Sequence, residues 1–194
     1  MQHGLLDSAN AWIMNYPDVA PAFVAARAGY DVWLGNSRGN TFSCANTKYD
    51  PWKNEKKFWD FSWDLMGKYD LPATLDYITL KTGHEKIAYI GHSQGTTQMY
   101  YGLATDEAYF KDKVSVFIAL APVTMLPNTE AELFTFAADF YDLIDDTFST
   151  LLIHSVLNRT WITSTTGKLF CNTIPELCLL LERLFVSSDP QLDD

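Results

Sequence analysis

The feature that most constrains this chain is the stretch from 86 to 97, KIAYIGHSQGTT. A short apolar run, residues 87–90, leads into Gly-His-Ser-Gln-Gly, and residues 96–104 have helical character. A G-x-S-x-G pattern between a strand and a helix is typical of a sharp turn that exposes a serine hydroxyl at the end of a sheet. Ser93 is therefore the candidate nucleophile.

Two glycines flank this serine for a steric reason. The strained turn brings the strand and helix backbones so close that a Cβ at Gly91 or Gly95 would clash. The N-terminus of the following helix favours a developing negative charge beside Ser93. We expect His92 to shape the turn without taking part in proton transfer.

A His-Gly pair near the start of the chain supplies a second element. In hydrolases with this serine turn, an oxyanion is held by the N–H after the nucleophile and by an N–H from an early loop. Here these donors would be the backbone amides of Gln94 and Leu5, and Gly4 would let the backbone approach a substrate carbonyl. The alternative is that His3 and Gly4 form only a turn.

Predicted helices and strands alternate around the serine turn. The predicted helices cover residues 17–28, 53–68 and 70–80, and the predicted strands cover residues 30–34, 87–90 and 114–120. Gly29 and Gly83 would end two helices, and Asp70 would cap one. This alternation predicts an α/β fold with a doubly wound, mostly parallel sheet.

Two further segments each leave two interpretations open. The aromatic residues of 53–68 fit a helix packed on one side, although an exposed aromatic patch could touch lipid. The glycine-rich turn at 35–40 lacks the ending of a phosphate loop, so we expect it to shape the floor near the active site. Arg38 in that turn would pair with a carboxylate rather than contact substrate.

Five sequence blocks, in order from Gln2 to Val123, resemble the acid lipase family of α/β-hydrolases, the gastric and lysosomal lipases. The blocks are QHGLLDSANAW, GYDVWLGNSRGNTF, KYDLPATLDYI, GHSQGTTQMYYGLAT and ALAPV. The resemblance implies an incomplete α/β-hydrolase fold, a mostly parallel sheet flanked by helices. It also implies a lipase that hydrolyses triacylglycerols or cholesteryl esters through an acyl-enzyme on Ser93.

The character of the chain changes after the last strand. Residues 128–146 are acidic and aromatic, which fits an amphipathic helix. The resemblance implies a partial hydrolase core over residues 1–126 and a partial helical cap, or lid, over residues 127–194 that covers an acyl channel until a lipid–water interface is met. A plain surface helix is the alternative.

The acid and the base of a catalytic triad are expected to be missing. On this fold they follow the nucleophile in the order Ser, Asp or Glu, His. His154 is the one histidine after Ser93, with Asp142 and Asp145 before it, but no strand that could carry it follows residue 120. We therefore expect no catalytic Asp or His in this chain, truncation at both ends relative to the family, and little or no activity.

The resemblance also implies a cap disulfide between Cys171 and Cys178, although their separation is shorter here. On one continuous helix seven residues would rise about 10 Å, too far for a bridge whose Cα atoms lie within about 7 Å. Pro175 can break such a helix, so a bridged loop stays open. Cys44 is left as an unpaired thiol.

Charge and hydropathy exclude several classes of protein. The formal net charge of −10 over 194 residues argues against nucleic-acid binding. No apolar run reaches the roughly 18 residues of a membrane span, and residues 1–6 lack the pattern of a signal peptide. We expect no metal and no cofactor. Full-length family members are lysosomal or secreted, but the location of this chain stays open.

The expected partner is a neutral lipid ester at a lipid–water interface. Two alternatives remain: a general carboxylesterase or thioesterase of the same fold, and a non-catalytic lipid-binding or regulatory product, which the missing acid and base would favour.

Overall fold

The computed structural model describes residues 1–126, 129, 132–151 and 173, and it divides the chain into two compact units, Met1–Met125 and Leu126–Asp194. The first unit carries two strands, β1 (Ile87–His92) and β2 (Val114–Leu120). Its helical segments are η1 (Ala9–Trp12), α1 (Pro21–Arg27), α2 (Glu55–Phe58), α3 (Trp63–Leu65), η2 (Met66–Asp70), α4 (Leu71–Thr82), α5 (Gln94–Thr105) and α6 (Glu107–Lys113).

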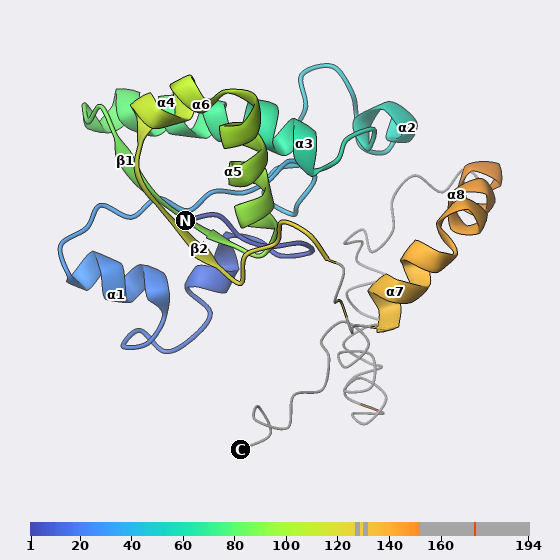
Figure 1. The fold of residues 1–194 in the computed structure, drawn as a ribbon, viewed down its shortest axis with the longest axis horizontal. Helices are drawn as coiled ribbons and strands as arrows, with labels where there is room; N and C mark the ends of the chain where they lie inside the picture. The colour runs from blue at the N-terminus through green and yellow to red at the C-terminus, as the bar shows by residue number, and fades with distance from the viewer. Residues whose placement is uncertain (127–128, 130–131, 152–172, 174–194) are drawn as a thin grey trace. The chain divides into compact units, whose positions relative to one another are not determined.

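The two strands pair in parallel, from Ile87 opposite Val114 to His92 opposite Leu120. Parallel neighbours need a crossover connection, and here α5 and α6 supply it. Figure 1 shows α4, α5 and α6 together on one side of the strands and α1 on the other. The α/β-hydrolase architecture predicted from the sequence is therefore present, as a partial parallel sheet flanked by helices.

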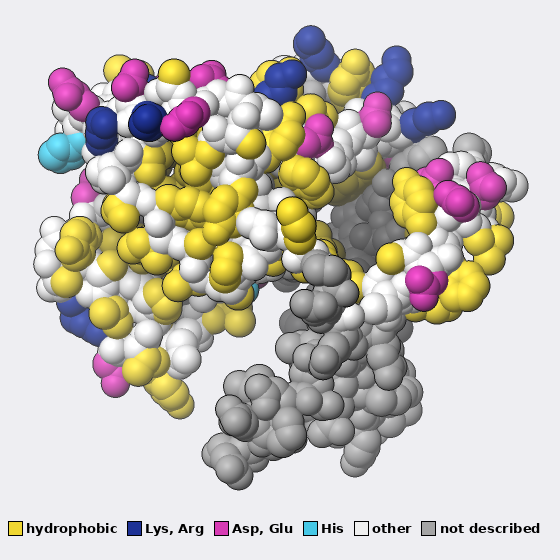
Figure 2. All heavy atoms as spheres, viewed as in Figure 1, with side chains coloured by type: hydrophobic (Ala, Val, Ile, Leu, Met, Phe, Trp, Pro, Cys, Tyr) yellow, Lys and Arg dark blue, Asp and Glu magenta, His cyan; other side chains and the backbone are white. Residues whose placement is uncertain are grey.

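The core lies between the strands and the α4–α5–α6 layer. Its buried members come from β1 and the three helices: Leu71, Leu75, Tyr89, Met99 and Phe110. Strand β2 adds the partly buried Val114 and Phe117. The opposite face of the sheet is apolar but open, because Val116, Ile118 and Leu120 keep 41–48% of their surface exposed. Figure 2 shows hydrophobic side chains gathered over β1 and β2 on this face.

Residues 30–34 were predicted to form a strand, and that prediction is wrong for the structure as it stands. The segment is extended, but the structure records only a bridge between Gln2 and Gly35, supported by the Gly35 N–H donating to the Met1 carbonyl at 2.9 Å. Its partner on that side is a pair of residues, Met1 and Gln2, which is too short for a regular ladder.

The helix predicted over residues 53–68 is broken into α2 and α3. Trp59 and Phe61, between these helices, pack on Gly39, where an added Cβ would lie 2.7 Å from each ring. A straight helix could not turn both rings toward the 35–40 turn, because residues two apart point to different sides of a helix. Tertiary packing overrides the helical pattern here.

Asp70 precedes α4 as predicted but makes no capping hydrogen bond. Its carboxylate instead forms an ion pair with Arg38, whose Nη2 lies 2.6 Å from Oδ1 of Asp70. The other end of α4 follows the prediction, because Gly83 adopts φ 74° and donates its N–H to the Thr79 carbonyl. The helix predicted over residues 17–28 shortens to α1, with Gly29 at φ 92° after it.

Within the described part of the second unit, α7 (Glu132–Asp139) and α8 (Tyr141–Thr150) follow one another. The rings of Phe136 and Phe140 pack with centroids 4.7 Å apart at this junction. Asp142, Asp145 and Asp146 give α8 its acidic character. None of the described helices in either unit has the length and apolarity to cross a bilayer.

Candidate active site

Ser93 stands at the junction of β1 and α5, the position that the sequence predicts. Its backbone adopts φ 50° and ψ −119°, a conformation that non-glycine residues rarely take and that costs about 1–3 kcal/mol. Three hydrogen bonds hold its backbone. The Ser93 N–H donates to the Leu120 carbonyl at 3.0 Å, and the Ser93 carbonyl accepts the Thr96 N–H at 2.8 Å and the Thr96 hydroxyl at 2.6 Å. Strand β2 therefore supports the strained turn directly.

The two glycines of the turn lie where no Cβ fits. An added Cβ at Gly91 would be 2.8 Å from the Gly95 carbonyl oxygen, and one at Gly95 would be 2.6 Å from the Gln2 carbonyl oxygen. Gln2 in turn lies beside β1, donating to the Ile90 carbonyl at 2.8 Å and accepting the His92 N–H at 3.0 Å. The opening residues are thus packed on the serine turn.

Gly4 brings the opening loop against the candidate nucleophile. A Cβ added at Gly4 would lie 3.0 Å from the Ser93 Cβ and 3.5 Å from its Oγ. Within the described residues, the backbone N–H groups of Leu5 and Gln94 donate no hydrogen bond to another protein atom. Two unpaired donors therefore flank the serine, one from the loop and one from the first residue of α5.

The Ser93 hydroxyl has no base bound to it in the described part of the chain, where Oγ makes no hydrogen bond. His92 precedes it on β1 and is exposed. His154 and the pair Cys171 and Cys178 lie outside the described residues, so the predictions about them stay predictions. Cys44 is a free thiol, and partial burial raises its pKa.

The 35–40 turn, which the sequence predicts to shape the floor near the active site, contacts the opening loop. The Ser37 N–H donates to Nε2 of His3 at 3.0 Å, and His3 is 2% exposed. The sequence did not indicate the Ser37 hydroxyl, which accepts hydrogen bonds from the amides of Gln2 at 2.8 Å and Gln98 at 3.1 Å. Gln2 and Gln98, whose side-chain amides are buried in the structure, are the residues that could have pointed to this hydroxyl.

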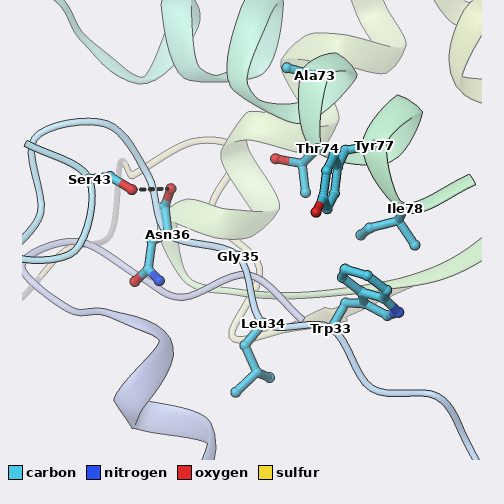
Figure 3. A pocket seen from close by; sticks show the side chains of 9 residues that line it. All are labelled: Trp33, Leu34, Gly35, Asn36, Ser43, Ala73, Thr74, Tyr77 and Ile78. Atoms are coloured by element: carbon cyan, nitrogen blue, oxygen red, sulfur yellow. Dashed lines mark hydrogen bonds between the residues drawn. The ribbon is translucent and has the colours of Figure 1, made fainter. Parts of the chain in front are cut away.

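A separate hollow of about 470 Å³ opens between residues 33–36 and α4 (Figure 3). Trp33 and Tyr77 form an edge-to-face pair at its side, and the Ser43 hydroxyl donates to the Asn36 carbonyl at 3.3 Å. Neither Ser93 nor the two unpaired amides line it. In the ranges that the structure describes, no group of three or more His, Cys, Asp or Glu residues is arranged to hold a metal ion.

The sequence model of the family described as alpha/beta hydrolase fold matches residues 1–157. The chain belongs to this family. Among its relatives, the α/β-hydrolase chain is 55% identical to gastric triacylglycerol lipase of Mus musculus and 50% identical to that of Homo sapiens. Each match runs over 131 residues, 68% of this chain and 32% of the relative.

A more distant relative extends the match to the whole chain. Lipase lipl-5 of Caenorhabditis elegans is 37% identical over all 194 residues, which is 48% of that protein. This α/β-hydrolase chain therefore spans about a third to a half of the length of the relatives it matches. The resemblance to the acid lipases that the five sequence blocks carry is confirmed.

Proposed function

We propose that this chain carries the nucleophile half of a serine ester hydrolase that acts on neutral lipids, triacylglycerols or cholesteryl esters. The observation that supports it most is Ser93 on a strained strand-to-helix turn, with the unpaired amides of Leu5 and Gln94 beside it. The similarity to gastric triacylglycerol lipase and to lipase lipl-5 supports a lipid substrate.

The chemistry follows from these positions. Ser93 Oγ attacks the ester carbonyl carbon while its proton passes to a base. The carbonyl oxygen becomes an oxyanion, which the N–H groups of Leu5 and Gln94 would stabilise. When the carbon–oxygen bond to the alcohol breaks, the alcohol leaves with the proton and the acyl group stays on Ser93. Water then releases the acid.

The base that takes the proton, and the carboxylate that orients it, are assigned to no described residue. We propose that the 194 residues therefore react slowly and that residues 1–126 form part of the hydrolase core. Residues 127–194, which include the acidic helices α7 and α8, would form part of a cap over the acyl site. The cellular location stays a prediction.

A fluorophosphonate probe tests the nucleophile without needing turnover. The serine oxygen displaces fluoride from the probe's phosphorus, and the stable adduct accumulates even when the reaction is slow. We expect an adduct on Ser93 by peptide mass mapping, and none in Ser93→Ala. Chain-length preference on p-nitrophenyl esters then separates a lipase from a general esterase or thioesterase.

A non-catalytic lipid-binding product is the second candidate. The Ser93 hydroxyl without a hydrogen-bonded base in the described residues favours it. An inert Ser93 together with saturable binding of a fluorescent triacylglycerol would support this reading against the enzymatic one.

A further inference from the structure

The tautomer of His3 is set by the backbone around it. A peptide N–H can only donate, so Nε2 of His3, 3.0 Å from the Ser37 nitrogen, must carry a lone pair. The proton of the neutral ring is then on Nδ1, which lies 2.8 Å from the Gly4 carbonyl oxygen and donates to it. Every polar position of the ring is therefore used within the opening loop and the 35–40 turn.

The orientation of Asn40 supports the same assignment. Its Oδ1 accepts the Phe42 N–H at 2.9 Å, which fixes which end of the amide is oxygen. The Nδ2 at the other end donates to Asn36 Oδ1 at 2.7 Å and lies 3.1 Å from Nε2 of His3. A second donor on Nε2 is compatible with a lone pair there and incompatible with a proton.

The bond to Gly4 has a geometric consequence for the next amide. In a trans peptide the C=O and the N–H point in opposite directions across one rigid plane. A hydrogen bond from His3 Nδ1 to the Gly4 carbonyl therefore also fixes the direction of the Leu5 N–H. Gly4 lies against Ser93, and the Leu5 N–H makes no hydrogen bond with the described protein.

We propose that His3 is a positioning residue that aims the Leu5 N–H at the oxyanion, rather than a base or a merely space-filling core histidine. The purpose of this arrangement, to stabilise an oxyanion, rests on the proposed function. The direction of the Leu5 N–H follows from the hydrogen bonds of His3 and does not depend on that function. The ring cannot serve Ser93 as a base, because its lone pair is occupied by the Ser37 amide and its proton by the Gly4 carbonyl.

Two substitutions separate the two ends of the ring. In His3→Asn the side-chain amide reaches the place of Nδ1 and can still donate to the Gly4 carbonyl, while the Ser37 N–H loses its acceptor. In His3→Gln the longer amide reaches the place of Nε2 and can accept from Ser37, while the Gly4 carbonyl loses its donor. Both variants bury an amide in place of an imidazole, so they are matched in polarity.

The orientation can be measured without any reaction. Residual dipolar couplings of the ¹⁵N-labelled chain report the direction of the Leu5 N–H, and long-range ¹H–¹⁵N spectra report the His3 tautomer. We expect the Nδ1–H tautomer in the wild type, an unchanged Leu5 coupling in His3→Asn and a changed coupling in His3→Gln. An Nε2–H tautomer, or equal couplings in all three proteins, would overturn the proposal.

The chemical purpose is tested by the rate of fluorophosphonate labelling of Ser93. Loss of an aimed oxyanion donor slows reactions by about 100-fold or more, so we expect His3→Gln to label at least about tenfold more slowly than His3→Asn. Rates that fall only in step with each variant's stability to urea would mean a structural role. Absence of labelling in the wild type would refute the proposed function and leave the dipolar couplings to decide the orientation.

Discussion

Gly4 lies so close to Ser93 that a methyl group on its Cα would be 3.0 Å from the serine Cβ and 3.5 Å from its Oγ. The opening loop and the serine turn are 89 positions apart in the chain, yet they form one surface. A substrate carbonyl that reached Ser93 would have to lie beside this glycine.

Gly4→Ala should therefore slow the reaction of Ser93 while changing the stability of the fold little. The added methyl group would push the loop from Ser93 or narrow access to its hydroxyl, and displacements of 1 Å near a reacting atom can cost on the order of 100-fold in rate. We expect at least about tenfold slower fluorophosphonate labelling, with a urea midpoint close to that of the wild type. Equal labelling rates would contradict the close approach of Gly4 to Ser93.

Gly95→Ala should lower stability as well as labelling. Its Cβ would be 2.6 Å from the Gln2 carbonyl oxygen and 2.9 Å from that of His3, both of them backbone atoms that cannot turn aside. Overpacking of this kind costs about 1–3 kcal/mol of unfolding free energy. Urea denaturation followed by tryptophan fluorescence measures the change.

Gly83→Ala is the matched control for that variant. Nothing lies within 4 Å of its added Cβ, but φ is 74°, so only backbone strain of roughly 1 kcal/mol is expected. Its labelling rate should equal that of the wild type. If Gly83→Ala slowed labelling as much as Gly95→Ala, lost stability rather than local geometry would explain both.

Arg38 is expected to act in the fold and not on substrate. Its guanidinium makes bonds of 2.6–3.0 Å to both oxygens of Asp70, and these side chains are 31% and 22% exposed. Arg38→Lys keeps the charge but loses the two-pronged contact, which after allowance for solvent screening should cost about 1 kcal/mol. The unfolding free energy should fall while the labelling rate is unchanged.

The exposed pair of Lys111 and Glu107, with side chains 73% and 69% exposed, gives the comparison for Arg38. Lys111→Gln should leave the urea midpoint unchanged, because solvent screens such pairs. A labelling defect in Arg38→Lys with normal stability would instead place Arg38 at the substrate.

His3 should make the stability of the chain depend on pH. Burial lowers the pKa of His3 from its ordinary 6.5, partly opposed by the bond to the Gly4 carbonyl and by Asp7. The unfolded chain therefore binds a proton more readily than the folded one. The contribution of the neutral His3 ring to the unfolding free energy is therefore fully present above pH 6.5. This contribution decreases as the pH falls below 6.5.

Urea unfolding at pH 7.5 and 5.5 measures this contribution. The wild type should lose more unfolding free energy between the two conditions than His3→Asn, which has no proton to gain. The amino group of Met1, whose pKa burial lowers to about 6, titrates in both proteins and cancels in the comparison. The same loss in both proteins would show that His3 does not titrate differently on folding.

The open face of the sheet predicts self-association. Val116, Ile118 and Leu120 stand on one side of β2 and are 41–48% exposed, a contiguous apolar surface (Figure 2). Ile118→Lys should reduce binding of the dye ANS and shift the chain toward monomer by analytical ultracentrifugation. Leu80→Lys, at a position on α4 that is 80% exposed and lies outside this strand, should change neither.

Much of the architecture could be predicted because its causes are local. The strand at Val114–Leu120 has the bounds expected from its apolar run, and Gly83 ends α4 because only glycine readily takes its left-handed conformation. The strained geometry of the serine turn is encoded by the five residues of the G-x-S-x-G pattern, 91–95. Neighbours in the chain suffice to determine features of this kind.

Contacts between distant segments decided the rest. Residues 53–68 have a helical pattern, yet packing of Trp59 and Phe61 on Gly39 breaks it. Asp70 has the chemistry of a cap, yet Arg38, 32 positions away, contacts both oxygens of its carboxylate in a two-pronged, charge-assisted pair.

For the candidate site, the sequence by itself determined the serine turn and the candidate oxyanion donors. Only the tertiary structure decided how the loop is held, through the bond from Ser37 to His3 across 34 positions and the pairing of Leu120 with Ser93. Local propensities involve energies of a few tenths of a kcal/mol per residue, whereas buried polar groups must be hydrogen-bonded wherever the fold brings a partner.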